Sequence, residues 1–190
     1  KIRIPAGYIR CNEFFKEKYR LDSIVKKKET QKNIAYLFQL SDFFNYIINR
    51  FNVWGSVETM LYKTAIVNFV SILEAMIFEC SNNICKPENC PKIKDCLNHF
   101  SKKQRNNSFE ALKKLNELRI TDFSDDELRR IKYIIDLRNK IHIRLSEKNE
   151  YMSSDFSLPL YNEMIALLQK LSERIYKYGV PLYGCCENKD

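Results

Sequence analysis

The sequence predicts an all-α protein, a helical bundle with four main helices and several short ones. Apolar residues recur at steps of three and four along most of the 190-residue chain, as in amphipathic helices. The chain has only 4 glycines and 5 prolines, fewer turn residues than a β-sandwich or barrel needs. Its length favours one continuous domain. We expect residues 1–56 to form a helical region that packs on a bundle formed by residues 57–190.

The first long helix is expected over residues 30–51, where one face is apolar. Gly55 and Ser56 interrupt that pattern, and serine is a residue type that caps helix N-termini. The next helix, over residues 57–83, is apolar nearly all round, so it should be the central, buried one. Glu74 within it needs a partner or a wet cavity, because burying an unpaired carboxylate is costly. Its simplest interpretation is a structural salt bridge to a neighbouring helix.

Three further helices follow in the second half of the chain. A short one is expected over residues 108–119, where apolar residues line one side. Ser124 and Glu127 form the S-x-x-E pattern of a capping box, so a helix should begin there and span about 125–145. The last helix is expected over residues 158–178, since a glycine and a proline follow its apolar stripe.

Residues 83–107 are expected to be irregular, apart from a short helix through Leu97 and Phe100. Cysteines in and next to this segment are separated by four, four and five residues, and His99 follows. None of these gaps is the C-x-x-C hook that suits zinc, so we expect no metal and no cofactor. A zinc-stabilised regulatory domain is the weaker alternative, and it would use Cys80, Cys85, Cys90 and Cys96.

Composition excludes some classes of protein and permits others. The four glycines are scattered singly, which excludes glycine-rich phosphate loops and dinucleotide fingerprints. A net charge of +8 permits a polyanionic partner such as RNA. The longest apolar run, residues 65–78, is shorter than the roughly 20 residues that span a bilayer, so no membrane association is expected. The first residues lack a signal-peptide core, which indicates reduced thiols and a cytoplasmic location.

The helix expected over residues 125–145 has two polar residues in the middle of its apolar arc. They are Arg138 and His142, one turn apart. Arginine keeps its charge and needs a partner or a wet cleft, whereas histidine titrates near neutral pH. Together they suit attack at a phosphodiester, with histidine moving protons and arginine stabilising the developing charge. The alternative is a structural Arg138–Glu74 ion pair and a hydrogen-bonded core His142.

Residues 136–143, DLRNKIHI, resemble the signature of HEPN domains, the higher eukaryotes and prokaryotes nucleotide-binding family. That signature has an arginine followed by a polar residue and, a few residues later, a histidine on a late helix. Residues 69–75, FVSILEA, resemble the early core helix of the family, which often carries a glutamate. The resemblance covers roughly residues 57–178. The family usually has four to six residues between arginine and histidine, whereas this chain has three.

The resemblance implies a metal-independent endoribonuclease or an RNA-binding protein. In cleavage, the RNA 2′-hydroxyl attacks the adjacent phosphate and leaves a 2′,3′-cyclic phosphate and a 5′-hydroxyl. His142 would act as general acid or base, and Arg138 would hold the phosphate. Glu74 would be a supporting residue. The candidates for substrate binding are Asn139, Lys140 and Arg144.

The same resemblance implies a homodimer in which both motif helices face a shared cleft, with Arg138 and His142 at or near the interface. Such domains recur in toxin–antitoxin and phage-defence systems, so an antitoxin or another protein partner is expected. The alternative is a HEPN-like binding or scaffold module without catalysis. The short spacing between arginine and histidine is the feature that favours this alternative.

Overall fold

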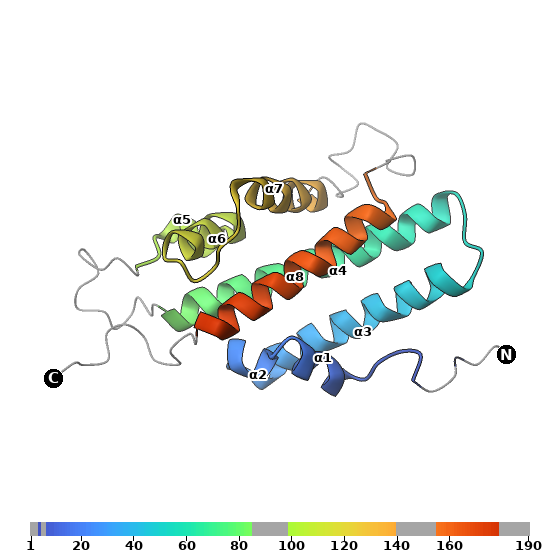
Figure 1. Cartoon of the computed structure of the whole chain (residues 1–190), viewed down its shortest axis with the longest axis horizontal. Coiled ribbons are helices and arrows are strands. Elements are labelled where there is room, and N and C mark those ends of the chain that lie inside the picture. The colour runs from blue at the N-terminus through green and yellow to red at the C-terminus, as the bar shows by residue number, and fades with distance from the viewer. Residues whose placement is uncertain (1–3, 5–6, 85–98, 140–154, 179–190) are drawn as a thin grey trace.

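The computed structural model describes residue 4 and residues 7–84, 99–139 and 155–178. Every regular element in these ranges is an α-helix, and no strand occurs among them. The all-α prediction is therefore confirmed for this part of the chain. Figure 1 shows the three longest helices lying side by side along the long axis of the molecule.

A hairpin of two long helices forms the framework. α3 (Lys28–Arg50) and α4 (Ser56–Ile84) run in opposite directions, and α8 (Leu158–Tyr178) lies along α4. About half of the 29 residues of α4 are buried, and this helix contacts α3, α6, α7 and α8. It is the central helix, as its all-round apolar pattern predicts.

Shorter helices cover the two sides of this framework (Figure 1). α1 (Asn12–Lys18) and α2 (Leu21–Ile24) pack beside α3, and α2 also contacts α8. α6 (Ser108–Glu117) and α7 (Asp125–Asn139) pack against α4 from the opposite side. Buried residues of all these helices belong to one hydrophobic cluster, so the first helices share a core with the last one.

α4 is long and apolar enough to pass for a membrane span by length and composition alone. Its most apolar window has a mean hydropathy of 1.5. In this structure 56% of that window is buried against other parts of the chain, as in the core helix of a folded domain.

The helix starts differ slightly from those predicted. α3 begins at Lys28, two residues earlier than expected. Ser56 was expected to precede the second helix as its cap, and it is instead the first residue of α4. Gly55 before it has a φ of +67°, a left-handed conformation that glycine adopts without a clash of Cβ. The tight turn between α3 and α4 therefore depends on the glycine.

The prediction of a short helix through Leu97 and Phe100 is wrong for Phe100, the one of the two residues that the structure describes. Phe100 is fully buried but lies before the helix, and Leu97 is outside the described residues. The helix is α5 (Lys102–Asn106), and it begins after a capping box. Ser101 Oγ accepts the N–H of Gln104, whose side chain accepts the N–H of Ser101. Reciprocal capping places the helix start at Lys102.

The capping box predicted for α7 is confirmed. The N–H of Glu127 donates to Ser124 Oγ at 3.3 Å, and the N–H of Ser124 donates to Glu127 Oε2 at 2.8 Å. The structure describes α7 as far as Asn139, and the predicted continuation to Leu145 lies outside the described residues.

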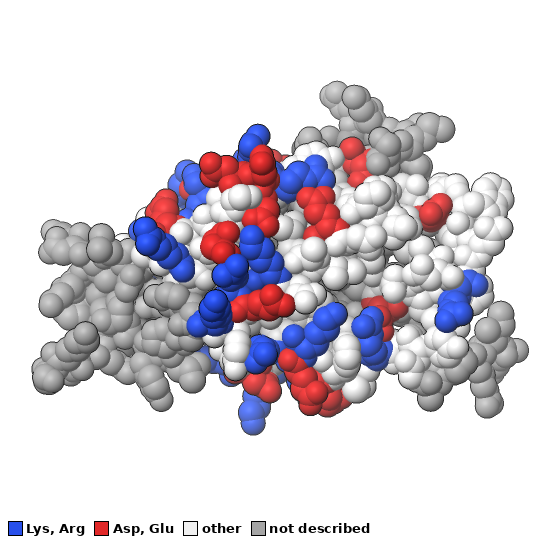
Figure 2. All heavy atoms as spheres, in the orientation of Figure 1, with Lys and Arg blue, Asp and Glu red and all other residues white. Residues whose placement is uncertain are grey.

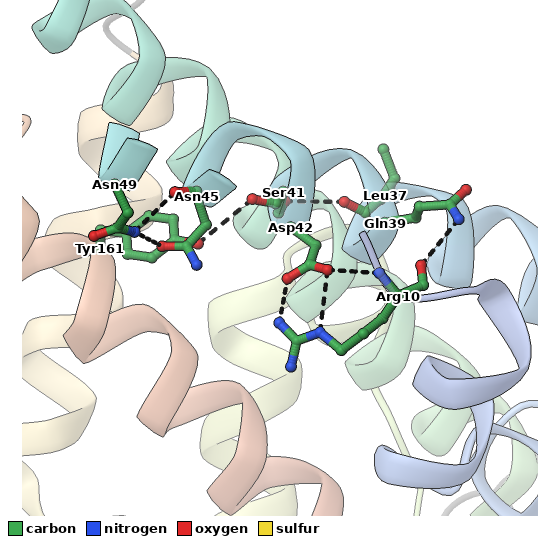
Figure 3. Close-up of polar contacts among 8 residues, drawn as sticks. All are labelled: Arg10, Leu37, Gln39, Ser41, Asp42, Asn45, Asn49 and Tyr161. Carbon is green, nitrogen blue, oxygen red and sulfur yellow. Dashed lines mark hydrogen bonds and ion pairs between the residues drawn. The ribbon is translucent and has the colours of Figure 1, made fainter. Parts of the chain in front are cut away.

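The segment before α1 is tied to α3 by one charged side chain (Figure 3). The backbone N–H of Arg10 donates to Asp42 Oδ2 at 2.9 Å, and its Nε donates to the same oxygen at 3.1 Å. Arg10 Nη2 pairs with the other carboxylate oxygen. Asp42 is buried, and its hydrogen bond to the guanidinium raises the pKa of Arg10. The pairing satisfies a carboxylate that burial would otherwise destabilise.

Candidate functional site

The arginine of the predicted motif pairs with the glutamate of the central helix. Arg138 lies in the last turn of α7, and its Nη2 forms an ion pair with Glu74 Oε1 on α4. Isoleucines and a leucine of α7 are buried against the core, and this packing turns Arg138 toward α4. The two side chains are 28% and 23% exposed, so the pair lies at the edge of the core rather than inside it.

A third helix contributes to this pair. Ser108, the first residue of α6, is buried, and its Oγ donates to Glu74 Oε1 at 3.0 Å. The carboxylate of Glu74 therefore receives donors from both α6 and α7. We call Glu74, Ser108 and Arg138 the α4–α6–α7 cluster.

The guanidinium of Arg138 is not fully used by this cluster. Its Nε is buried and has no hydrogen-bond partner in the described structure. A buried unsatisfied donor typically costs about 1–3 kcal/mol, so the cluster contains one polar atom whose burial is uncompensated. The site lies in the last described turn of α7.

Asn68, Ser71 and Glu74 are polar residues spaced three apart on α4, and they would form one polar seam if they acted together, but they behave differently from one another. Only Glu74 reaches another helix, by the contacts given above. Ser71 Oγ donates to the carbonyl of Val67 one turn earlier, at 3.0 Å. The Nδ2 of Asn68 is buried without a hydrogen-bond partner among the described residues. These three residues therefore do not act as one polar seam.

The remaining residues of the predicted motif divide into two groups. Asn139 is exposed at the end of α7, next to Arg138. His142, Lys140 and Arg144 lie outside the described residues. The structure therefore pairs Arg138 with Glu74, which is the contact expected if the two residues serve only as a structural ion pair. It gives no contact of His142, which lies outside the described residues.

Of the four cysteines of the weaker zinc alternative, the structure describes one. Cys80 is buried in α4, and burial raises the pKa of its thiol to about 12. A thiol with this pKa is protonated at neutral pH, whereas zinc binds the thiolate. The others, Cys85, Cys90 and Cys96, lie outside the described residues. Within residues 7–84, 99–139 and 155–178, no three metal-binding side chains lie close together.

A pocket of about 270 Å³ between the segment before α1 and α3 was not predicted. Its lining includes the Arg10–Asp42 pair and two asparagines of α3, whose contacts Figure 3 shows. Asn49 Nδ2 donates to the carbonyl and to the side-chain oxygen of Asn45, both at 2.8 Å. Much of this polar surface is thus already satisfied within the chain. Arg10 and Asp42 are 32 residues apart, so no local pattern signals their meeting.

The chain matches no protein-family model, no curated protein and no solved structure. The functional argument therefore depends on the α4–α6–α7 cluster and on the motif that contains Arg138. The HEPN resemblance stays a prediction.

Proposed function

We propose that this chain is a HEPN-like bundle whose main helices are α3, α4, α7 and α8, and that the end of α7 forms a site for RNA. The observation that carries the proposal is the state of Arg138. Glu74 holds its guanidinium in one place, while the side chain stays 28% exposed and its Nε has no partner in the described structure. A cation fixed in this way loses little freedom when it binds a phosphate.

The proposed reaction is metal-independent cleavage of RNA. His142 takes the proton from a 2′-hydroxyl, whose oxygen then attacks the adjacent phosphorus. The bond to the 5′-oxygen breaks, that oxygen takes a proton from water while the imidazolium of His142 returns its proton to solvent, and a 2′,3′-cyclic phosphate remains. Arg138 stabilises the extra negative charge on the phosphate oxygens during the attack. Asn139 and Lys140 lie between Arg138 and His142 in the sequence, Arg144 follows His142 by two positions, and these three are the proposed substrate-binding residues.

Pairing of two copies around a shared cleft belongs to the same proposal, as do a cytoplasmic location and an antitoxin or another protein partner. Two copies would place two such motifs along one RNA strand. RNA is the preferred partner because the chain has a net charge of +8 and cleavage of this kind requires a 2′-hydroxyl.

A second candidate is a HEPN-like binding or scaffold module without catalysis. A specific observation favours it: Glu74 already balances the charge of Arg138, and Ser108 satisfies the same carboxylate further. An ion pair of this kind between helices is common as a structural contact. In that case the α4–α6–α7 cluster contributes to stability and binds no phosphate.

Cleavage of total RNA in EDTA separates the two candidates. We expect His142→Ala to abolish cleavage and to leave the melting temperature unchanged, because proton transfer typically contributes about 10²–10⁴-fold. Arg138→Lys should also lose activity, since lysine lacks the planar fork that grips two oxygens. Arg129→Lys is the matched control, because Arg129 is on the same helix but is exposed and forms its ion pair with Asp126, one turn earlier. Activity that survives His142→Ala, or that needs a divalent ion, would contradict the mechanism.

A further inference from the structure

The end of the α3–α4 hairpin is apolar but is not covered by the rest of the described structure. From residue 43 to residue 61 no residue is buried, although most of them are apolar. Three side chains at the tip are the most open: Phe51 is 39% exposed, Trp54 is 78% exposed and Val57 is 60% exposed. On the face that Figure 2 shows, this end of the molecule is nearly free of charged side chains.

The size of this surface is that of an interaction site. Aromatic side chains bury about 150–250 Å² each, so the exposed parts of Phe51 and Trp54 alone amount to roughly 250 Å². With Val57 added, the surface reaches the roughly 300–600 Å² of the largest apolar patch on a typical monomer, and such patches are often functional. Half-buried apolar residues such as Ile47 and Leu61 continue along both helices at helical spacing. Apolar residues at this spacing suit packing against other helices.

The charges of the hairpin end are self-complementary. Arg50 and Glu58 are the only charged residues between positions 43 and 61. Neither has an ion-pair partner in the described part of the chain, although the Arg50 guanidinium lies 5.2 Å from the centre of the Tyr8 ring. In a two-fold contact each copy presents the same surface, so one positive and one negative group pair twice.

We propose that the hairpin end, residues 43–61, is a surface on which a second copy of this chain docks. The α3–α4 ends of the two copies pack as four helices, with Arg50 opposite Glu58 of the partner subunit and Trp54 near the centre. The charges of Arg50 and Glu58 cancel, so residues 43–61 have a net charge of zero. A surface without net charge does not attract anionic lipid, whereas it can pack against a second copy of itself. This proposal is independent of the proposed function, because no residue of the α4–α6–α7 cluster takes part.

Sedimentation equilibrium of the full chain tests the apolar part of this surface. Trp54→Ser should weaken self-association at micromolar concentration about 30-fold, as expected for an exposed tryptophan at the centre of an interface, whereas a dimer formed only through the shared cleft of the proposed function would be unaffected. Tyr36→Ser is the matched control, because Tyr36 is an aromatic residue of α3 that is 51% exposed but lies well outside the hairpin end. A monomeric wild type, or equal weakening by both variants, would overturn the proposal.

A charge-swap series tests whether the occupant is a second copy. Arg50→Glu and Glu58→Arg alone should each weaken the dimer about tenfold, since each places like charges opposite each other. The double variant R50E/E58R should restore wild-type association, because both charges are then exchanged on both copies. Failure of this rescue would rule out the two-fold pairing. So would a monomeric wild type that binds phosphatidylcholine–phosphatidylserine vesicles, since lipid would then be the occupant.

Discussion

Arg138 keeps its charge at any physiological pH, so its surroundings must compensate that charge. Glu74 of α4 meets this need, and its carboxylate in turn receives donors from Arg138 and from Ser108 of α6. The cluster therefore ties three helices together at one point, whether or not a phosphate binds there. Loss of one member leaves the others desolvated and incompletely paired.

Replacing the carboxylate should reveal the structural part of this role. We expect Glu74→Gln to lower the free energy of unfolding by about 1–3 kcal/mol, below the range for fully buried pairs because both side chains are partly exposed. Ser108→Ala should cost about 1 kcal/mol, the usual contribution of one hydrogen bond. Urea unfolding followed by circular dichroism measures both values. A Glu74→Gln variant as stable as the wild type would show that the pair contributes nothing net.

The two described cysteines should differ in reactivity. Cys11 is exposed, whereas Cys80 is buried and its thiol pKa is raised to about 12. Iodoacetamide reacts with thiolates, so at pH 8 it should modify Cys11 quickly and Cys80 only after unfolding. Mass spectrometry of tryptic peptides gives both rates, with a urea-unfolded sample as the control. Equal rates in the native protein would mean that α4 is more accessible than this packing allows.

At the scale of single helices, α7 is fixed at its N-terminus by two kinds of contact. Glu127 completes the capping box with Ser124 and also accepts from Lys170 of α8, with both carboxylate oxygens 2.8 Å from Nζ. Burial opposes ionisation of Glu127, but these hydrogen bonds outweigh it and lower the pKa of the carboxyl group. The helix start is therefore coupled to the last helix of the bundle.

This coupling should depend on pH. Because the folded-state pKa of Glu127 is lowered, its stabilising contribution is complete above the unfolded value of about 4.3 and is lost as pH falls through the folded value. Wild type and Glu127→Gln should therefore differ in stability at pH 7 and converge in the acid range. Thermal melts between pH 7 and pH 3 test this. A constant difference over the whole range would mean that the ion pair is not responsible.

Helix length also decides how well the sequence predicts the elements. Helices such as α4 and α8 contain several full periods of buried residues, so their first residues were predicted within one position. α1 and α2 have 7 and 4 residues, too few for a period to stand out, and they were expected only as part of a helical region. The Arg138–Glu74 contact was one of two alternatives, because a wheel shows which face a residue occupies but not which residue it meets. Ser108 was missed because a lone hydroxyl has no periodic signal.

At the scale of the whole molecule, the first helices share a core with the last. Leu21 and Ile24 of α2 are buried, and Ser172 Oγ of α8 donates to the carbonyl of Tyr19 at 2.7 Å. Asn83 Nδ2 of α4 donates to the carbonyl of Ile24 at 3.1 Å. Contacts of this kind couple the region before residue 56 to the bundle and favour cooperative unfolding.

A core substitution in the first region should therefore destabilise the whole chain. Leu21→Ala removes a fully buried side chain and should cost about 2–5 kcal/mol, within a single calorimetric transition. Asp22→Ala is the matched control, because the neighbouring Asp22 is exposed and should change stability by less than about 0.5 kcal/mol. Two separate transitions, with only one shifted, would show that residues 1–56 unfold on their own.

The burial of α4 has a consequence for the order in which the chain is made. The ribosome completes this apolar 29-residue helix long before it reaches α8, which covers one of its sides. At about 5–20 residues per second, the residues between Ile84 and Tyr178 take roughly 5–20 s to synthesise. During that interval α4 is exposed on the nascent chain and resembles a membrane span in length and composition. α3 is already complete and can cover one side of α4, so we expect it to compete with chaperones and targeting factors that bind apolar segments.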